Sequence, residues 1–169
     1  MIRAAALAVL SMALAACAGT SLQPQPHNPG RPATTDAAQA APFAADPRAI
    51  MVDVAASMLG QPYRWGGAAP GGFDCSGLVA YAASGAGIRV PRTAHDQLRA
   101  GTPVARAELQ AGDLVFMHLE RKELHVGIVI GGERFIHAPS AGGQVRIDSL
   151  AAPPYSRGFL AARRVIAIR

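Results

Sequence analysis

The sequence predicts a single α+β domain in which N-terminal helices pack on an antiparallel sheet. Between residues 46 and 101, apolar side chains recur at helical spacing, and polar residues stand where helix N-caps are expected. From residue 113 onward the pattern changes to short apolar stretches separated by turns that carry glycine or proline. The predicted domain spans residues 46–169, which is long enough to bury one core.

Each of the three predicted helices has a recognisable start. Asp46 and the proline after it are typical of an N-cap and a first helical position, and Gly60 is expected to end this helix. Asp74 is the expected cap of a second helix, which follows a glycine-rich loop. Thr93 is the expected cap of a short third helix that ends near Gly101.

The strands follow the helices, and one hairpin decides which side chains meet. The predicted strands cover residues 113–117, 125–130, 134–138, 145–147 and 159–166. A three-residue loop at 131–133 pairs residue 130 with residue 134 and puts Gly127 opposite His137. His125 then lies on the same face, one diagonal step from His137. A loop of two or four residues would place the histidines on opposite faces.

The first 45 residues are expected to lie outside the domain. Residues 1–16 hold one basic residue and then a short apolar stretch, which is typical of a secretory signal. The Leu-Ala-Ala-Cys that ends at Cys17 resembles the lipobox of bacterial lipoproteins, so we expect a lipidated Cys17 anchored in a membrane. Because Ala18 follows in place of aspartate, resemblance to Gram-negative sorting rules favours the outer membrane, facing the periplasm. Ordinary cleavage near Ala16 and a buried helix are the alternatives.

Residues 17–45 are predicted to form the lipidated cysteine and a flexible tether. Five prolines and few large apolar side chains fall between residues 18 and 46. Such a stretch cannot bury enough surface to offset the entropy of ordering it. The alternative is an ordered extension packed on the domain.

Composition and charge exclude several classes of protein. Hydrophobic residues make up 50% of the chain and charged residues 16%, which excludes a highly charged disordered protein. The net charge is +5, but the basic residues are scattered, so no nucleic acid partner is expected. The two cysteines, Cys17 and Cys75, can form at most one disulfide, and lipidation of Cys17 would leave Cys75 as the only thiol.

Cys75 is the candidate nucleophile. It stands at the predicted start of the second helix, where the helix dipole is expected to favour the thiolate and lower the thiol pKa. The glycine-rich loop before it lets another segment approach its backbone closely. The alternative is a small buried hydrophobic residue.

Two histidines are the candidate base and its partner. His125 would take the proton of Cys75 and later protonate a leaving amine, while His137 would bind the other ring nitrogen of His125. The backbone N–H of Cys75 and the Tyr63 hydroxyl would meet the oxyanion of the tetrahedral intermediate. A zinc site that adds His118 is disfavoured because no closely spaced ligand pair is present, and no metal or cofactor is expected.

Six segments carry a further pattern. They read Tyr-Arg-Trp-Gly-Gly at 63–67, Gly-Phe-Asp-Cys-Ser-Gly-Leu-Val at 72–79, Val-Pro-Arg-Thr-Ala at 90–94, Gly-Asp-Leu-Val-Phe at 112–116, His-Val-Gly-Ile at 125–128 and Phe-Ile-His-Ala-Pro at 135–139. Together they resemble the NlpC family of cell-wall cysteine peptidases, over about residues 49–165. The resemblance implies a permuted papain-like fold, with the nucleophile helix packed on a central antiparallel sheet of about five to six strands. It also implies that Cys75, His125 and His137 form a catalytic Cys-His-His set.

The same resemblance implies a substrate. The family hydrolyses stem peptides of peptidoglycan, typically between D-γ-glutamyl and diaminopimelyl residues, and in some members at the D-alanyl–diaminopimelyl crosslink. By match to the family motifs, Tyr63, Trp65, Asp74, Ser76 and Arg92 would line the cleft. Asp74 and Arg92 would there meet ammonium and carboxylate groups of the stem peptide.

We therefore expect a lipid-anchored peptidoglycan endopeptidase of the cell envelope. The sequence departs from the family pattern at Met117 and His118, where many relatives have an aromatic pair, and this would reshape a wall of the cleft. Two alternatives stay open. One is another thiol enzyme on the same fold, such as an amidase or acyltransferase, and the other is a non-catalytic wall-binding lipoprotein.

Overall fold

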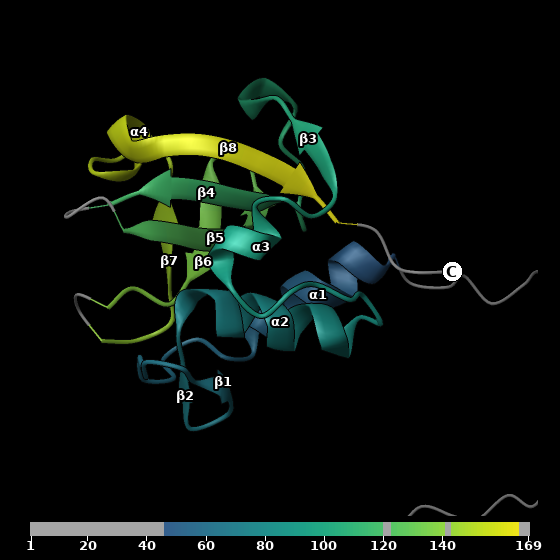
Figure 1. Ribbon diagram of the computed structural model, residues 1–169, viewed down its shortest axis with the longest axis vertical. Coiled ribbons are helices and arrows are strands. Elements are labelled where there is room, and N and C mark those ends of the chain that lie inside the picture. The colour runs from purple at the N-terminus through teal and green to yellow at the C-terminus, as the bar shows by residue number, and fades with distance from the viewer. Residues whose placement is uncertain (1–45, 120–122, 141–142, 166–169) are drawn as a thin grey trace, which may run out of the picture. The chain divides into compact units, whose positions relative to one another are not determined.

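The computed structural model describes residues 46–119, 123–140 and 143–165 (Figure 1). The predicted signal, the lipidated Cys17 and the tether lie outside these residues. In the described part of the chain, no helix is both long and apolar enough to cross a bilayer.

The described residues form helices packed on an antiparallel sheet, which confirms the predicted α+β class. The helical segments are α1 (Pro47–Ala56), α2 (Cys75–Gly85), α3 (Ala94–Gln97), the 3-10 turn η1 (Arg106–Glu108) and α4 (Tyr155–Gly158). The strands are β1 (Ala68–Ala69), β2 (Gly72–Phe73), β3 (Thr102–Val104), β4 (Leu114–His118), β5 (Leu124–Gly131), β6 (Arg134–His137), β7 (Arg146–Ser149) and β8 (Phe159–Arg164).

Six of the described strands make one sheet in the order β3-β8-β4-β5-β6-β7. The helices α1 and α2 lie together against one face of it, and the small β1–β2 hairpin lies beyond α2 (Figure 1). Because β4 and β5 are central, both of their faces are covered. This placement sets the start of α2 against β5, the strand that carries His125.

The three predicted helix caps are all present. The Asp46 side chain accepts the N–H of Arg48 at 2.9 Å, Asp74 caps α2, and Thr93 accepts the N–H of Asp96 at 3.2 Å. The first helix ends at Ala56, before the glycine expected to end it, because the next residues form tight turns. The cap geometry thus follows the sequence, whereas α1 and α3 end before the glycines that were expected to end them.

The β5–β6 hairpin reaches the predicted register through a different turn. Ile128 pairs with Ile136, as expected, but pairing continues to Gly131 and Arg134 and leaves two residues in the turn. A bulge at Ile130 absorbs the register shift. We expected a two-residue loop to place the two histidines on opposite faces of the sheet. The bulge restores the register, so both histidines lie on the same face.

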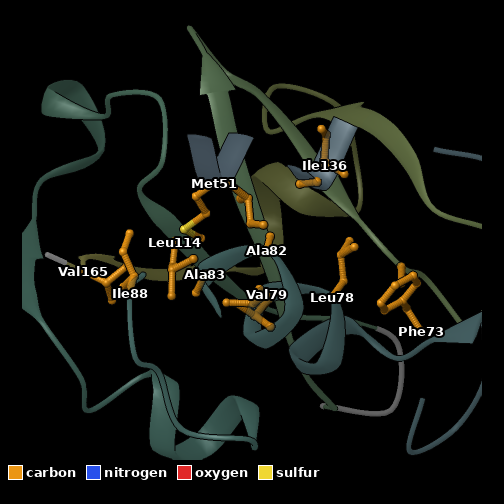
Figure 2. Close-up of a cluster of buried hydrophobic side chains, with 14 of the residues drawn as sticks. Met51, Phe73, Leu78, Val79, Ala82, Ala83, Ile88, Leu114, Ile136 and Val165 are labelled. Atoms are coloured by element: carbon orange, nitrogen blue, oxygen red, sulfur yellow. The ribbon is translucent and has the colours of Figure 1, made fainter. Parts of the chain in front are cut away.

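Two apolar clusters fill the two faces of the sheet. Between the helices and the sheet, Met51 of α1 and Leu78 and Val79 of α2 pack against Leu114 and Ile136 (Figure 2). Each such side chain contributes about 1.5–3 kcal/mol relative to an exposed one. This packing holds α2, the helix that begins at Cys75, against the strands.

The second cluster covers the opposite face of the sheet. Val115 and Met117 of β4 pack there with Phe135, Leu150 and Tyr155. Alternation along each strand sends successive side chains to opposite faces, so this is the face on which the odd-numbered residues of β5 and β6 lie. Both candidate histidines therefore stand on it, at the ends of their strands.

A single methyl group at Gly77 is expected to disrupt the start of α2. The Cβ of an alanine there would overlap the carbonyl of Gly67, which already accepts the N–H of Asp74 at 3.0 Å. We expect Gly77→Ala to lower the free energy of unfolding in urea by about 1–3 kcal/mol. Gly85→Ala on the same helix is the control, because its Cβ meets only the movable side chain of Val54 at 3.0 Å. Equal stabilities of the two variants would contradict this packing.

Candidate active site at the start of helix α2

Asp74 joins the glycine-rich loop to the start of α2. Its Oδ1 accepts the N–H of Gly77 at 2.6 Å, and its Oδ2 accepts the N–H of Gly66 at 3.1 Å. The Arg92 guanidinium donates to both oxygens, at 3.0 Å and 2.7 Å. Burial raises the pKa of Asp74, but the hydrogen bonds from Arg92 and Gly77 outweigh it and hold the pKa below its ordinary value. The carboxylate is thus ionised and fully engaged.

The residues expected to meet substrate charges pair with one another in this structure. Arg92 also donates to the Ser76 hydroxyl at 3.1 Å, and that hydroxyl donates to Asp74 at 3.2 Å. The Arg92 side chain is 42% exposed and that of Asp74 is 14% exposed. A ligand can therefore reach the guanidinium more readily than the carboxylate.

Gln97 is a supporting residue that sequence reasoning missed. Its buried Nε2 donates to the carbonyl of Ser76 at 3.0 Å and to that of Pro91 at 2.8 Å. These two bonds tie the first turn of α2 to the segment that carries Arg92. No local pattern in α3 predicts this link, because both acceptors are backbone groups of distant segments.

Cys75 is the first residue of α2 and is partly buried. The backbone of Val126 in β5 hydrogen-bonds the sulfur. Val126 pairs with β4 but lies beyond the residues of β5 that pair with β6. The sulfur therefore sits beside the strand residue that follows His125. It is not sealed inside apolar packing.

The predicted lowering of the Cys75 pKa is wrong. Burial raises the pKa of the thiol, and the Asp74 carboxylate raises it further, while backbone N–H groups of Val126 and Ser76 lower it less. The favourable field at a helix start is outweighed by the loss of water around the sulfur. The resting site therefore holds a thiol.

The predicted contact between the two imidazoles is present. His125 Nε2 lies 2.8 Å from His137 Nδ1, and the rings meet edge to face with centroids 5.0 Å apart. His125 is 7% exposed and His137 is fully buried. Gly127, between them on β5, was expected to leave open space, but a side chain there would overlap the Phe135 ring. The glycine makes room for that ring.

Burial keeps both imidazoles neutral. It lowers the pKa of His125 to about 3, helped by the neighbouring His137 and Arg146. It also lowers the pKa of His137 to about 4, against the opposing effect of the Asp148 carboxylate. At neutral pH the site contains an uncharged thiol and two uncharged imidazoles.

Asp148 of β7 is the main site residue that sequence reasoning missed. Its Oδ2 lies 2.8 Å from His137 Nε2, accepts the Tyr155 hydroxyl at 2.6 Å, and accepts Arg146 Nε at 2.9 Å. A partial signal existed, since a strand near 145–147 was expected to follow the strand that carries His137. Which of its residues faces the histidine depends on long-range register, which the sequence does not display.

Tyr63 and Trp65 lie on the loop before β1. Burial raises the pKa of Tyr63, and the charges that Cys75 and Asp74 can carry raise it further. The Tyr63 hydroxyl is therefore close enough to Cys75 to interact with it electrostatically. Trp65 is 85% exposed, so it is a surface residue and not part of the core. Of the two, Tyr63 has the clearer link to the nucleophile.

Met117 and His118 end β4 beside the site. Met117 is buried and pairs opposite His125, so it packs on the same face as the imidazole. His118 points to the other face by strand alternation, away from the histidine pair. Among the residues that the structure describes, no three His, Cys, Asp or Glu side chains are grouped so that they could hold a metal ion.

Comparison of the sequence with known proteins identifies relatives of this chain. A sequence model of the NlpC/P60 family matches residues 60–164. The murein DD-endopeptidase MepH of Escherichia coli is 45% identical over 114 residues, which cover 64% of this chain and 42% of that protein. The γ-D-glutamyl-L-lysine dipeptidyl-peptidase of Bacillus subtilis is 37% identical over 117 residues, which cover 68% of this chain and 40% of that protein. The chain thus spans about two fifths of the length of these relatives.

Solved structures show the same arrangement of helices on an antiparallel sheet. An NlpC/P60 family protein from Bacillus cereus superposes with a TM-score of 0.66 at 34% identity, covering 70% of this chain and 40% of that one. The peptidoglycan hydrolase RipB of Mycobacterium tuberculosis superposes with a TM-score of 0.62 at 31% identity, covering 72% and 66%.

Neutral buried histidines predict a loss of stability in mild acid. Each histidine has a lower pKa folded than unfolded, so the unfolded chain binds more protons below about pH 6.5. Stability therefore falls as the pH drops toward the folded pKa values, about 3 for His125 and about 4 for His137. Urea titrations should show a decrease of about 1.5–2 kcal/mol per histidine between about pH 7 and about pH 5.

A matched pair of variants isolates this effect. His137→Asn should flatten the dependence of unfolding free energy on pH, and the same change at exposed His95 should leave the slope as in the wild type. A wild-type stability that stays constant over this range would show that the histidines take up protons as readily in the folded state as in the unfolded chain, and would contradict the neutral pair.

Proposed function

This chain belongs to the NlpC/P60 family, and from that premise we propose that it is a peptidoglycan endopeptidase of the cysteine peptidase type. The observation that carries the proposal is the hydrogen bond to the sulfur of Cys75 from the backbone of Val126, the residue that follows His125 of the buried imidazole pair. A nucleophile, a base and a group that orients the base are the parts needed for thiol hydrolysis. Relatives named as murein and γ-D-glutamyl peptidases support peptidoglycan stem peptides as the substrate.

The first half of the reaction forms a thioester. His125 Nδ1 takes the proton from Cys75 as the sulfur attacks the scissile carbonyl, because the Nε2 of that ring is occupied by His137. The backbone N–H of Cys75, which has no partner within the helix at the first turn, and the Tyr63 hydroxyl stabilise the oxyanion. His125 then gives its proton to the leaving amine as the C–N bond breaks.

The second half restores the enzyme. A water molecule attacks the thioester carbonyl and passes a proton to His125, and the sulfur leaves. His125 returns that proton to the sulfur, so that a carboxylic acid is released and the thiol is regenerated. The buried setting means that each charge on His125 is transient.

The cluster around Arg92 is the proposed recognition site for the stem peptide. The exposed part of the Arg92 guanidinium suits a substrate carboxylate, while Asp74 and Ser76 suit an amine. Trp65 and Tyr63 extend this surface along the loop. The proposed bond is the D-γ-glutamyl–diaminopimelyl bond or the D-alanyl–diaminopimelyl crosslink. One relative is named a murein DD-endopeptidase and another a γ-D-glutamyl-L-lysine dipeptidyl-peptidase, which supports a bond within the stem peptides.

Attachment to the cell envelope is part of the same proposal. A lipidated Cys17 would hold the protein on the periplasmic side of the outer membrane, and residues 18–45 would let the domain reach the wall polymer. A flexible chain of this length spans roughly 30 Å.

Purified peptidoglycan fragments test the function. We expect wild type to release new peptide products and Cys75→Ser to reduce the rate by about 10³-fold or more. Cys17→Ser is the matched control, because it changes the other cysteine and should cleave in solution like wild type. Mass spectrometry of the products identifies the bond.

Two outcomes would contradict the proposal. Equal product from wild type and Cys75→Ser would exclude thiol catalysis. Retention of the protein on wall fragments with no cleavage would favour a binding protein.

A further inference from the structure

One carboxylate oxygen lies behind the histidine pair and accepts three hydrogen bonds. Asp148 Oδ2 is 2.8 Å from His137 Nε2, 2.6 Å from the Tyr155 hydroxyl and 2.9 Å from Arg146 Nε. Partial burial raises the pKa of Asp148, but these donors together hold it below its ordinary value. The carboxylate is therefore ionised and can only accept hydrogen bonds.

An ionised Asp148 dictates where the ring protons lie. His137 is neutral and carries one ring proton, which must be on Nε2 because that nitrogen faces an acceptor. Its Nδ1 is then bare and accepts from His125 Nε2–H across 2.8 Å. His125 is also neutral, so its Nδ1 is bare as well and is the nitrogen free to take a proton from Cys75.

We propose that Asp148 is a positioning residue, which sets the tautomers of His137 and His125 and so leaves His125 Nδ1 as the base. The proposal rests on the function given above, but it assigns a role to a residue outside the Cys-His-His set. Asp148 touches neither substrate nor sulfur. It acts through two successive hydrogen bonds.

The surroundings of His137 hold the ring in the orientation that this role needs. The His137 ring lies 4.7 Å from Phe135 and 5.4 Å from Tyr155, centroid to centroid. Tyr155 also meets Phe135 edge to face at 5.1 Å. These rings enclose a fully buried imidazole, so it cannot rotate to exchange its two nitrogens without displacing them.

Asp148 acts on His137 mainly by fixing which ring nitrogen carries the proton, and less by its negative charge. Arg146 binds the same carboxylate oxygen and lowers the pKa of both histidines, while the carboxylate raises the pKa of His137 by a larger amount than Arg146 lowers it. Burial outweighs both influences, so the charge of Asp148 does not protonate His137. The contribution of Asp148 to His137 is a hydrogen-bond acceptor, Oδ2, held at a fixed position.

Two substitutions at Asp148 separate the hydrogen bond from the charge. Asp148→Ala removes the acceptor, and we expect kcat on stem-peptide fragments to fall about 10- to 100-fold with KM nearly unchanged. Asp148→Asn keeps an oxygen where three donors converge, so it should stay within about threefold of wild type. Asp53→Ala, at an exposed carboxylate of α1, is the control for general effects.

Nitrogen-15 NMR of the imidazole rings gives a readout that does not depend on cleavage. In wild type and Asp148→Asn, His137 should carry its proton on Nε2, and in Asp148→Ala the Nδ1-protonated form should appear. If Asp148→Ala cleaves like wild type, or loses activity with the His137 tautomer unchanged, the proposal is overturned. An Asn variant as impaired as the Ala variant also overturns it.

Failure of the proposed function would look different. Wild type would then cleave no wall fragment, while the imidazole spectra of wild type and variants would still decide the role of Asp148.

Discussion

The withdrawal of a thiol and two imidazoles from water is the constraint on which the chemistry of this site depends. Burial moves all three groups toward their uncharged forms, raising the pKa of Cys75 and lowering those of His125 and His137. A thiolate–imidazolium pair is thus disfavoured at rest. In the proposed mechanism the proton leaves the sulfur only when a carbonyl is in place to accept the electrons, which ties charge separation to substrate binding.

Two Asp–Arg pairs support the buried thiol and imidazoles, one at the start of α2 and one behind the imidazoles. At the start of α2, Asp74 and Arg92 hold the glycine-rich loop and the helix that carries Cys75. Behind the imidazoles, Asp148 and Arg146 hold the ring of His137. Both carboxylates accept several donors, so each fixes a backbone or ring that would otherwise move.

Much of the architecture could be predicted because its signals are local. The caps at Asp46, Asp74 and Thr93 follow from side-chain chemistry beside the helix they start. β3 was missed because it is a three-residue edge strand with a central proline, and β1 and β2 because each has two residues. Short edge elements depend on their neighbours more than on their own pattern.

The contact between the two histidines was predicted from the sequence, but the electrostatics around them and Cys75 were not. The shared face of His125 and His137 followed from strand pairing, although a bulge at Ile130 replaced the expected loop. The pKa of Cys75 was predicted in the wrong direction, because a helix start is visible in the sequence and the loss of water is not. Asp148 was missed because its contact with His137 depends on the register between β6 and β7.

Ultraviolet absorbance of the thiolate tests the uncharged resting site most directly. The spectrum of Cys17→Ser, in which Cys75 is the only thiol, is compared with that of the protein in which both cysteines are serine. We predict no thiolate absorbance at about pH 7, and a signal that grows only at a pH above the range in which an ordinary cysteine ionises. A full thiolate signal that persists from neutral pH into mild acid would show an ion pair at rest and contradict the account.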